Sequence, residues 1–188
     1  MLETCEYLKQ TGFEVTYLNV DGFGSVDPDD VRKAISDRTA LISIMHANNE
    51  VGTLNDLAEI AGIARQHRVL FHSDAVQTFG RLPISVSKLG VDLLSISAHK
   101  IYGPKGIGAL YVRRGVKMER LIHGGGQERG WRAGTENVPL AVGFAAAAAL
   151  MEQEREPENQ RLAQLKIVLQ NMLRDRFSSV LFNGHPDR

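Results

Sequence analysis

Short runs of β-branched and aliphatic residues alternate, along the first half of the chain, with longer segments whose apolar residues recur every three or four positions. The short runs are typical of buried strands, and the longer segments are typical of amphipathic helices. The predicted strands cover residues 13–20, 40–45, 69–72, 92–96 and 108–113, the last of which could run antiparallel. Helices between consecutive strands favour parallel pairing. The sequence therefore predicts an α/β fold with a mostly parallel sheet flanked by helices.

Three helices are predicted in the first half of the chain. The apolar spacing of residues 2–8 indicates a helix that ends before Gly12. Asp27 and Pro28 are residue types that begin a helix, since Asp caps the first amides and Pro fits the first turn. A third helix covers about residues 56–67 and leads into the next strand.

The second half of the chain is richer in glycine and alanine and has a long helical pattern. The glycine-rich stretch 124–134 is expected to be an ordered loop, and the alanine run 145–149 suits close helix packing. Residues from about 138 to 177 are helical in pattern, but Pro157 lacks an amide donor and clashes with the preceding turn, so two helices are predicted. Residues 180–184 resemble the first strand of a further unit. The predicted domains are a large domain over 1–156, then a linking helix with the start of a small α+β domain over 157–188.

The composition is that of a globular protein without net charge. Among 188 residues, 22 are Lys or Arg and 22 are Asp or Glu, which argues against nucleic acid or an anionic membrane as a partner. The longest apolar stretch, 140–151, is shorter than the roughly 20 residues needed to cross a bilayer. Residues 1–6 have neither the basic start nor the apolar core of a secretory signal, so we expect a cytoplasmic location.

One cysteine, Cys5, is present. A single thiol excludes an internal disulfide framework and any zinc site with several thiolates, and it fits a reducing compartment. Cys5 is expected to be a small buried hydrophobe.

Polar residues follow the predicted strands at the points where parallel α/β sheets bind ligands. They occupy residues 46–50, 73–77, 97–100 and the glycine loop. Taken singly, Asp74 could be a helix cap, Lys100 a surface lysine, and Asn48 and Asn49 turn residues. Their convergence on one edge of one sheet favours a shared site instead.

A lysine after one apolar strand and an acid after its neighbour are what Schiff-base chemistry with pyridoxal phosphate requires. The amine of Lys100 could bind the aldehyde, and the carboxylate of Asp74 could keep the pyridine nitrogen protonated. Ser97 and His99, two residues apart on an extended chain, could contact the phosphate together. Gln77 could reach the ring oxygen.

Four segments of the chain resemble the cysteine desulfurases, which belong with the selenocysteine lyases to the class V aminotransferase superfamily. These segments are residues 46–52 (HANNEVG), 72–77 (HSDAVQ), 97–108 (SAHKIYGPKGIG) and 124–137 (GGGQERGWRAGTEN). Their order and spacing make the match far more specific than any single motif. The resemblance implies a pyridoxal-phosphate-dependent transferase fold of type I, with residues 1–156 as part of the cofactor-binding large domain.

The resemblance also implies a role for each matching residue. Lys100 and His99 would be catalytic, with Lys100 holding the cofactor covalently and later transferring the proton. The implied cofactor-binding residues are Lys100, Asp74, Gln77, Asn49, Ser97, His99 and Thr135, and no metal is implied. Asp74 would pair with the pyridine nitrogen, Gln77 and Asn49 would lie near the ring oxygen, and Ser97 and His99 would hold the phosphate.

A homodimer is implied because the threonine matching Thr135 reaches the phosphate bound by the neighbouring subunit in this family. Arg129 and Arg132 would shape that shared edge, or would instead donate to backbone carbonyls. The implied activity is removal of sulfur from L-cysteine, giving L-alanine and a protein persulfide for iron-sulfur cluster or thio-cofactor assembly through a sulfur-acceptor or scaffold protein.

Several family features have no match in these 188 residues. They are a threonine phosphate ligand and a ring-stacking histidine that come earlier in the family, and a substrate-binding arginine and a nucleophilic loop cysteine that come later. Cys5 cannot replace that cysteine, because it lies far in sequence from Lys100. We therefore expect a partial chain.

Four other interpretations stay open. The motifs do not distinguish a selenocysteine lyase, and another Schiff-base enzyme of the superfamily would carry similar ones. The chain could also be a non-catalytic scaffold with the same fold. A metal hydrolase would use imidazoles and a carboxylate, here His46, His72, Asp74, His99 and His123, but it leaves Lys100, Gln77 and Thr135 unexplained.

Overall fold

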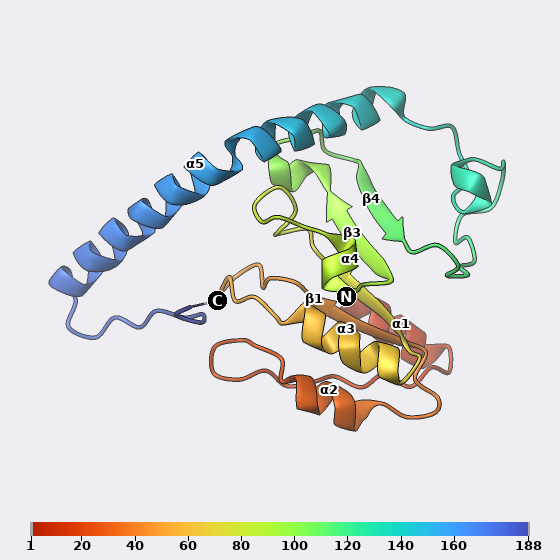
Figure 1. Cartoon of the computed structure of the whole chain (residues 1–188), viewed down its shortest axis with the longest axis horizontal. Coiled ribbons are helices and arrows are strands. Elements are labelled where there is room, and N and C mark those ends of the chain that lie inside the picture. Colours follow the sequence, from red (N-terminus) through yellow and green to blue (C-terminus); the bar gives the residue numbers. More distant parts are fainter. Residues whose placement is uncertain (1, 188) are drawn as a thin grey trace.

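The computed structural model describes residues 2–187 and has one sheet with helices packed around it (Figure 1). Its helices are α1 (Leu2–Gln10), α2 (Pro28–Ala34), α3 (Leu57–Gln66), α4 (Val86–Leu89) and α5 (Val138–Arg176), with short 3-10 helices η1 (Ala98–Ile101) and η2 (Glu128–Gly130). Its strands are β1 (Leu41–Met45), β2 (Leu70–Asp74), β3 (Leu93–Ser97) and β4 (Gly108–Val112). The predicted α/β class is confirmed.

The sheet has the order β1-β2-β3-β4. The first three strands are parallel, and β4 runs antiparallel to β3, with Ser97 opposite Gly108. Met45 lies opposite Asp74, and Asp74 lies opposite Ser95. The carboxyl ends of β1, β2 and β3 therefore meet at one edge of the sheet.

The two faces of this sheet differ in chemistry. Ile42, Phe71 and Leu94 point to one face and pack with the apolar side of α3 in the main core. That side of α3 consists of Leu57, Ile60, Ala61, Ile63 and Ala64, all buried. The opposite face carries Ser43 and His72, which are polar although they lie mid-strand. Burial of the apolar face holds the strands in register, since a slip of one residue would exchange the two faces.

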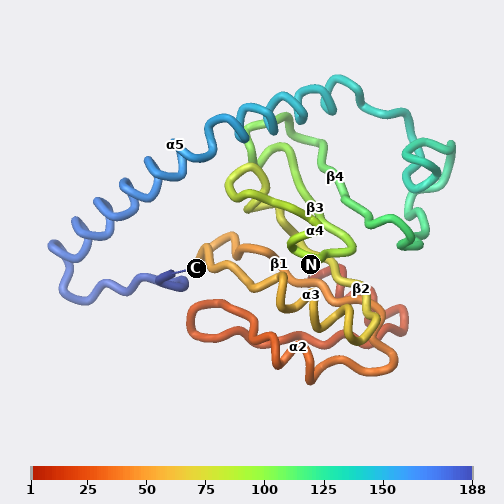
Figure 2. The backbone as a smooth tube through the Cα atoms, viewed as in Figure 1, coloured from red at the N-terminus to blue at the C-terminus, as the bar shows by residue number. Residues whose placement is uncertain are grey.

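Capping residues fix the helices around the sheet. Asp27 accepts the amide of Asp29 at 2.8 Å, and Pro28 occupies the first turn of α2, as predicted. Asp56 accepts the amide of Glu59 at 3.1 Å at the start of α3. α2 and α3 are in contact, and Figure 2 shows them side by side on the same side of the sheet.

α5 is one continuous helix of 39 residues, so the predicted break at Pro157 is wrong. The helix is fastened to the body on both sides of the proline. Before it, Met151 is buried in a second core with Ile101. After it, Nδ2 of Asn159 donates to the carbonyl oxygen of Arg81 at 2.7 Å. These contacts offset the roughly 3 kcal/mol that an internal proline costs a helix.

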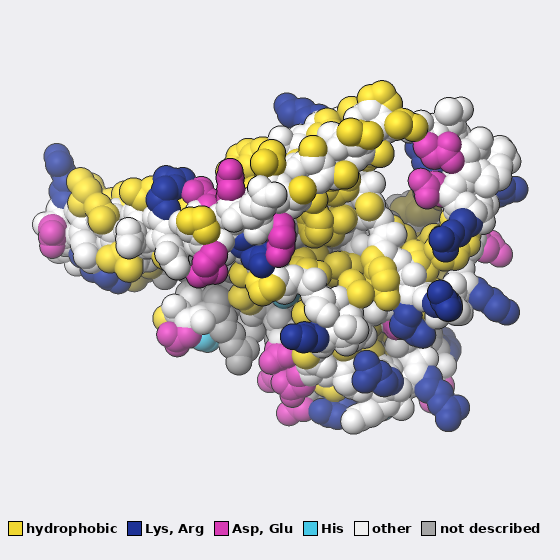
Figure 3. Space-filling model, turned by 45° about the horizontal axis from the view of Figure 1, so that its top comes forward, with side chains coloured by type: hydrophobic (Ala, Val, Ile, Leu, Met, Phe, Trp, Pro, Cys, Tyr) yellow, Lys and Arg dark blue, Asp and Glu magenta, His cyan; other side chains and the backbone are white. Residues whose placement is uncertain are grey.

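The second half of α5 leaves the body and exposes apolar side chains, and Figure 3 shows yellow side chains along the helix. The exposed large apolar residues of this half are Leu162, Leu165, Ile167, Val168, Leu169 and Met172. The predicted boundary between residues 156 and 157 falls inside this helix and stays a prediction.

Two predicted strands are absent from the described residues. Residues 13–20 form no strand: Leu18 packs on the core, Phe13 and Tyr17 are exposed, and β1 pairs only with β2 in the described chain. Residues 180–184 are also irregular. Just beyond them, the amide of His185 donates to Oγ1 of Thr53 at 2.9 Å, so this tail packs on a loop rather than on a strand. Cys5 is half-buried on α1, not fully buried as predicted.

Candidate functional site

The carboxyl edge of β1, β2 and β3 collects most of the predicted site residues. Asp74 is the last residue of β2, Ser97 is the last residue of β3, and Lys100 follows in η1. The amide of His46, just after β1, donates to the carbonyl oxygen of Asp74 at 2.9 Å and extends the ladder past the strands. The structure thus places a carboxylate and an amine at the ends of neighbouring strands.

Asp74 is half-buried and has a local hydrogen bond. Its Oδ1 accepts the amide of Val76 at 2.9 Å, which organises the turn after β2. The sequence left open whether Asp74 acts as a cap, and this hydrogen bond is a contact of that type. Among residues 2–187 no other hydrogen bond to this carboxylate is present, so it retains acceptor capacity for a ligand.

Ser97 and His99 lie together as predicted. Oγ of Ser97 is 2.8 Å from Nδ1 of His99. The chain between them is not extended as expected, because η1 begins at Ala98 and turns the imidazole back toward the hydroxyl. A hydroxyl and an imidazole side by side are groups that can donate hydrogen bonds to a phosphate.

Lys100 is half-buried in η1 between two buried residues, Ala98 and Ile101. Both neighbours pack against α5 in the second core. A close approach makes this packing possible: a Cβ on Gly103 would lie 3.2 Å from Cβ of Ala147. The backbone that carries Lys100 is therefore held by α5, in agreement with the close packing expected of the alanine run.

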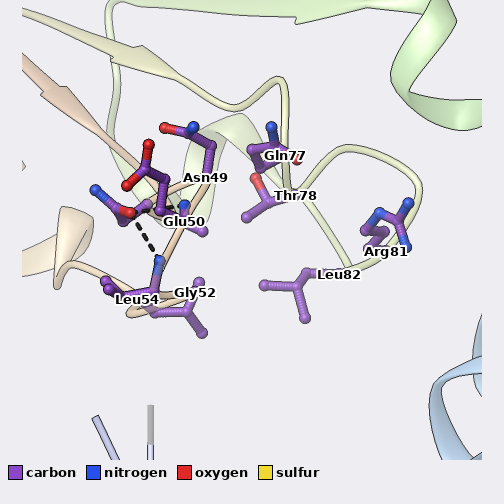
Figure 4. A pocket seen from close by; sticks show the side chains of 11 residues that line it. Asn49, Glu50, Gly52, Leu54, Gln77, Thr78, Arg81 and Leu82 are labelled. Atoms are coloured by element: carbon purple, nitrogen blue, oxygen red, sulfur yellow. Dashed lines mark hydrogen bonds between the residues drawn. The ribbon is translucent and has the colours of Figure 1, made fainter. Parts of the chain in front are cut away.

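Asn49 and Gln77 line a groove of about 400 Å³ between the loop after β1 and the turn after β2 (Figure 4). Glu50, Thr78, Arg81 and Leu82 also line it. Lys100, Asp74 and Ser97 are not part of its lining. Of the predicted site residues, the groove thus contains Asn49 and Gln77.

Thr135 is not brought to this edge. It is exposed in the segment between η2 and α5, which Figure 1 shows projecting away from the strand ends. Its contribution to a neighbouring subunit stays a prediction. In the same segment Nη1 of Arg132 donates to the carbonyl oxygen of Ala133 at 2.6 Å, which is the backbone role left open above.

A ladder of side chains crosses the polar face of the sheet and was missed from the sequence. Nδ1 of His72 lies 2.7 Å from Oγ of Ser43, and its Nε2 lies 2.9 Å from Oγ of Ser95. His46 has a hydroxyl partner as well, with Nδ1 2.9 Å from Oγ1 of Thr78. Both histidines therefore have hydroxyl side chains as partners. Polar residues on one face of three apolar strands, Ser43, His72 and Ser95, were the available signal.

Both imidazoles are shielded from water. Burial lowers the pKa of His46 and of His72 below the ordinary 6.5, and the carboxylate of Asp74 opposes the effect at His72. Within residues 2–187 no group of three or more His, Cys, Asp or Glu side chains is arranged to hold a metal. None of the helices in that range is both long and apolar enough to cross a membrane.

The sequence model of the class V aminotransferases matches residues 2–186. The chain belongs to this family. It is 53% identical over 184 residues to the cysteine desulfurase IscS of Dictyoglomus turgidum, an alignment that covers 98% of this chain and 47% of that protein. The resemblance to cysteine desulfurases is thereby confirmed, and the chain spans about half the length of the curated relatives it matches.

Solved structures agree with this assignment. A NifS-like protein superposes with a TM-score of 0.89 at 45% identity, covering 93% of this chain and 48% of that one. A protein described as SspA in complex with cysteine superposes with a TM-score of 0.77 at 47% identity, covering 79% of this chain and 43% of that one. The fold expected for a pyridoxal-phosphate-dependent transferase is confirmed, and the family is one of pyridoxal-phosphate enzymes.

The residues at the sheet edge fit this cofactor by their chemistry. An aldehyde requires an amine, a pyridine nitrogen requires a carboxylate, and a phosphate requires neutral or cationic donors. Lys100, Asp74 and the Ser97–His99 pair supply these groups on adjacent strand ends.

Proposed function

We propose that the complete protein is a pyridoxal-phosphate-dependent cysteine desulfurase, which converts L-cysteine into L-alanine and a protein-bound persulfide. The observation that carries this proposal is the placement of Lys100 and Asp74 at the ends of neighbouring parallel strands, with the Ser97–His99 pair beside them. The identity of 53% to a cysteine desulfurase supports the choice of reaction.

Each of these residues has one task in the proposed reaction. Bound pyridoxal phosphate supplies an electron sink for bond breaking at the substrate's α and β carbons. Lys100 holds the cofactor and, once displaced by substrate, accepts and returns the proton at its Nζ. Asp74 places its carboxylate at the pyridine nitrogen, and Ser97 and His99 hold the phosphate. Asn49 and Gln77 orient the ring oxygen from the groove side.

The proposed partners follow from the same assignment. The sulfur leaves toward an acceptor or scaffold protein for iron-sulfur cluster or thio-cofactor assembly. Two copies of the chain form a homodimer in which Thr135 reaches the cofactor of the other subunit. Thr135 is exposed, and the segment between η2 and α5 projects away from the strand ends (Figure 1), which supports a role outside its own site. A cytoplasmic location is proposed with these partners, and cell fractionation tests it.

Covalent labelling tests the cofactor assignment directly. The protein expressed from its complete gene is incubated with pyridoxal phosphate, reduced with borohydride and digested, and the labelled peptide is mapped by mass. We expect the label on Lys100 and its loss in Lys100→Ala. Lys105→Ala is the matched control, because Lys105 is exposed in the same segment and should leave the label intact. Labelling spread over surface lysines, with none on Lys100, contradicts the proposal.

Turnover separates the remaining alternatives. L-cysteine should give equal amounts of alanine and transferable sulfur, whereas a selenocysteine lyase would act on L-selenocysteine only. A labelled protein that turns over neither amino acid would be a scaffold or another Schiff-base enzyme of the superfamily. Mixed dimers of Lys100→Ala and Thr135→Ala subunits should recover part of the activity, because one of the two shared sites is then intact. No recovery would remove Thr135 from the neighbouring site.

A further inference from the structure

His46 lies between the two arms that flank the groove, which are the loop 47–54 after β1 and the turn 75–82 after β2. It directly follows β1 and is 8% exposed. Its amide donates to the carbonyl oxygen of Asp74, and its own carbonyl oxygen accepts the amide of Asn55, both at 2.9 Å. Its imidazole Nδ1 lies 2.9 Å from Oγ1 of Thr78. One residue therefore contacts the end of β2, the far end of its own loop, and the turn that carries Gln77.

The hydrogen bond to Thr78 has a defined direction. Thr78 is 2% exposed, and its hydroxyl donates to the carbonyl oxygen of Ala75 at 3.3 Å. A hydroxyl has one proton to donate, so its oxygen is left to accept from Nδ1–H of His46. Burial lowers the pKa of His46, which favours the neutral imidazole with a single N–H.

The loop that carries Asn49 is a stiff unit. Oδ1 of Asn48 accepts the amides of Glu50 and Val51 at 2.8 and 3.0 Å. The amide of Asn48 donates to the carbonyl oxygen of Thr53, and Ala47 forms a bridge with Leu54. The position of Asn49 is consequently set by how this whole loop sits against its neighbours.

The link to Thr78 is the one side-chain hydrogen bond, among residues 2–187, between this loop and the turn at 75–82. Figure 4 shows Asn49 and Gln77 on facing sides of the groove, with Thr78 next to Gln77. The His46–Thr78 contact thus joins the two arms at the end nearest the sheet, beside the backbone hydrogen bond from His46 to Asp74.

We infer that His46 is a positioning residue of the cofactor site: through Thr78 it holds the Asn49 loop and the Gln77 turn at the separation that the cofactor ring requires. The inference rests on the proposed function, because the ring is what the two arms would hold. His46 itself does not touch the ring in this assignment. Loss of its Nδ1–H would leave the arms intact but free to shift apart.

Substitutions at both ends of the contact test the inference in the protein expressed from its complete gene. His46→Leu removes the donor, Thr78→Val removes the acceptor at nearly constant volume, and His46→Asn replaces Nδ1–H with an amide of similar reach. The dissociation constant for pyridoxal phosphate is measured on each apoprotein. We expect it to rise about tenfold in His46→Leu and in Thr78→Val, the scale of one buried hydrogen bond. The double variant should bind no more weakly than either single variant, and His46→Asn should recover most of the affinity.

A measurement without cofactor accompanies the titration. Amide hydrogen exchange over residues 47–54 and 75–82 should accelerate in His46→Leu, whereas exchange in α3 should not. The matched control is His67→Leu, because His67 is exposed at the end of α3 and should change neither quantity.

Three outcomes separate failure of the positioning role from failure of the proposed function. Additive losses in the double variant, or unchanged affinity in folded His46→Leu, overturn the positioning role while leaving the proposed function in place. Lower thermal stability with unchanged cofactor affinity and unchanged exchange in both arms assigns His46 a purely structural role and also overturns it. A wild-type protein that fails to bind pyridoxal phosphate contradicts the proposed function itself, and the positioning role fails with it.

Discussion

Oγ of Ser97 lies 2.8 Å from Nδ1 of His99, across the point where β3 ends and η1 begins. The strand gives the serine its direction, and the tight helical turn brings the imidazole back to meet it. Ser97→Ala should weaken binding of pyridoxal phosphate about tenfold, because one donor to the phosphate is lost and the imidazole loses its neighbour. Fluorescence titration of the apoprotein measures this change. Ser87→Ala, an exposed change on α4, serves as the control, and equal affinity in the two variants would remove Ser97 from the phosphate site.

Stability should fall as the pH drops below 6.5. Burial lowers the folded-state pKa of His46 and His72 below this ordinary value, so the unfolded chain binds protons that the folded protein refuses. The free energy of unfolding then decreases with falling pH, by at most about 1.4 kcal/mol per pH unit for each group. Urea titrations between pH 5 and 8 measure the slope. Each of His46→Asn and His72→Asn should flatten it, and an unchanged slope in both would contradict the prediction.

Gly80 should tolerate no side chain. Its φ is +77°, and a Cβ there would lie 2.8 Å from Cγ2 of Ile101 and 3.2 Å from Cβ of Met151. Gly80→Ala should lower the free energy of unfolding by about 2–4 kcal/mol, which combines backbone strain with overpacking. Gly115→Ala is a matched control, since its φ of +93° carries the strain but no atom lies within 4 Å of the added carbon. Equal losses in the two variants would show that the close approach costs nothing.

Substitution of Ser73, unlike that of Gly80, should cost no stability. Its Oγ is buried on the apolar side of β2 and has no hydrogen-bond partner among residues 2–187. Ser73→Ala should therefore leave stability unchanged or raise it by up to about 1 kcal/mol, because no hydrogen bond is lost. Ser43→Ala, which removes a partner of His72, should instead lower stability by about 1 kcal/mol. Thermal unfolding of the two variants compares them, and a larger loss in Ser73→Ala would point to a partner for that hydroxyl.

The sequence predicted the elements whose local signals agree with their packing. The strands before His46, Asp74 and Ala98 were recognised because apolar runs ended in polar turns, and those ends located the candidate site. Residues 13–20 alternate like a strand, yet pairing depends on a neighbour that the local pattern does not contain. Pro157 was given too much weight, because the contact between Asn159 and Arg81, 78 positions apart in sequence, cannot be predicted from the local sequence.

The site residues also fall into those that the sequence identified and those that it missed. Residue types and motifs identified Lys100, Asp74 and Gln77, whose chemistry is distinctive. The partners of His46 and His72 were missed because hydroxyl residues are common. The pairing of His72 depends on strand register, and that of His46 depends on the turn after β2. Register follows from the packing of the whole apolar face against α3.

α5 is one unbroken helix, and it contacts the 3-10 turn that carries Lys100. At about 1.5 Å per residue the helix is roughly 58 Å long, and its pivot is the contact of Ala147 and Met151 with η1. From Met151 to its end at Arg176 the helix extends about 38 Å, so a tilt of about 10° about that contact displaces its end by roughly 6–7 Å. The position of the apolar second half of α5 is thereby coupled to the turn that carries Lys100.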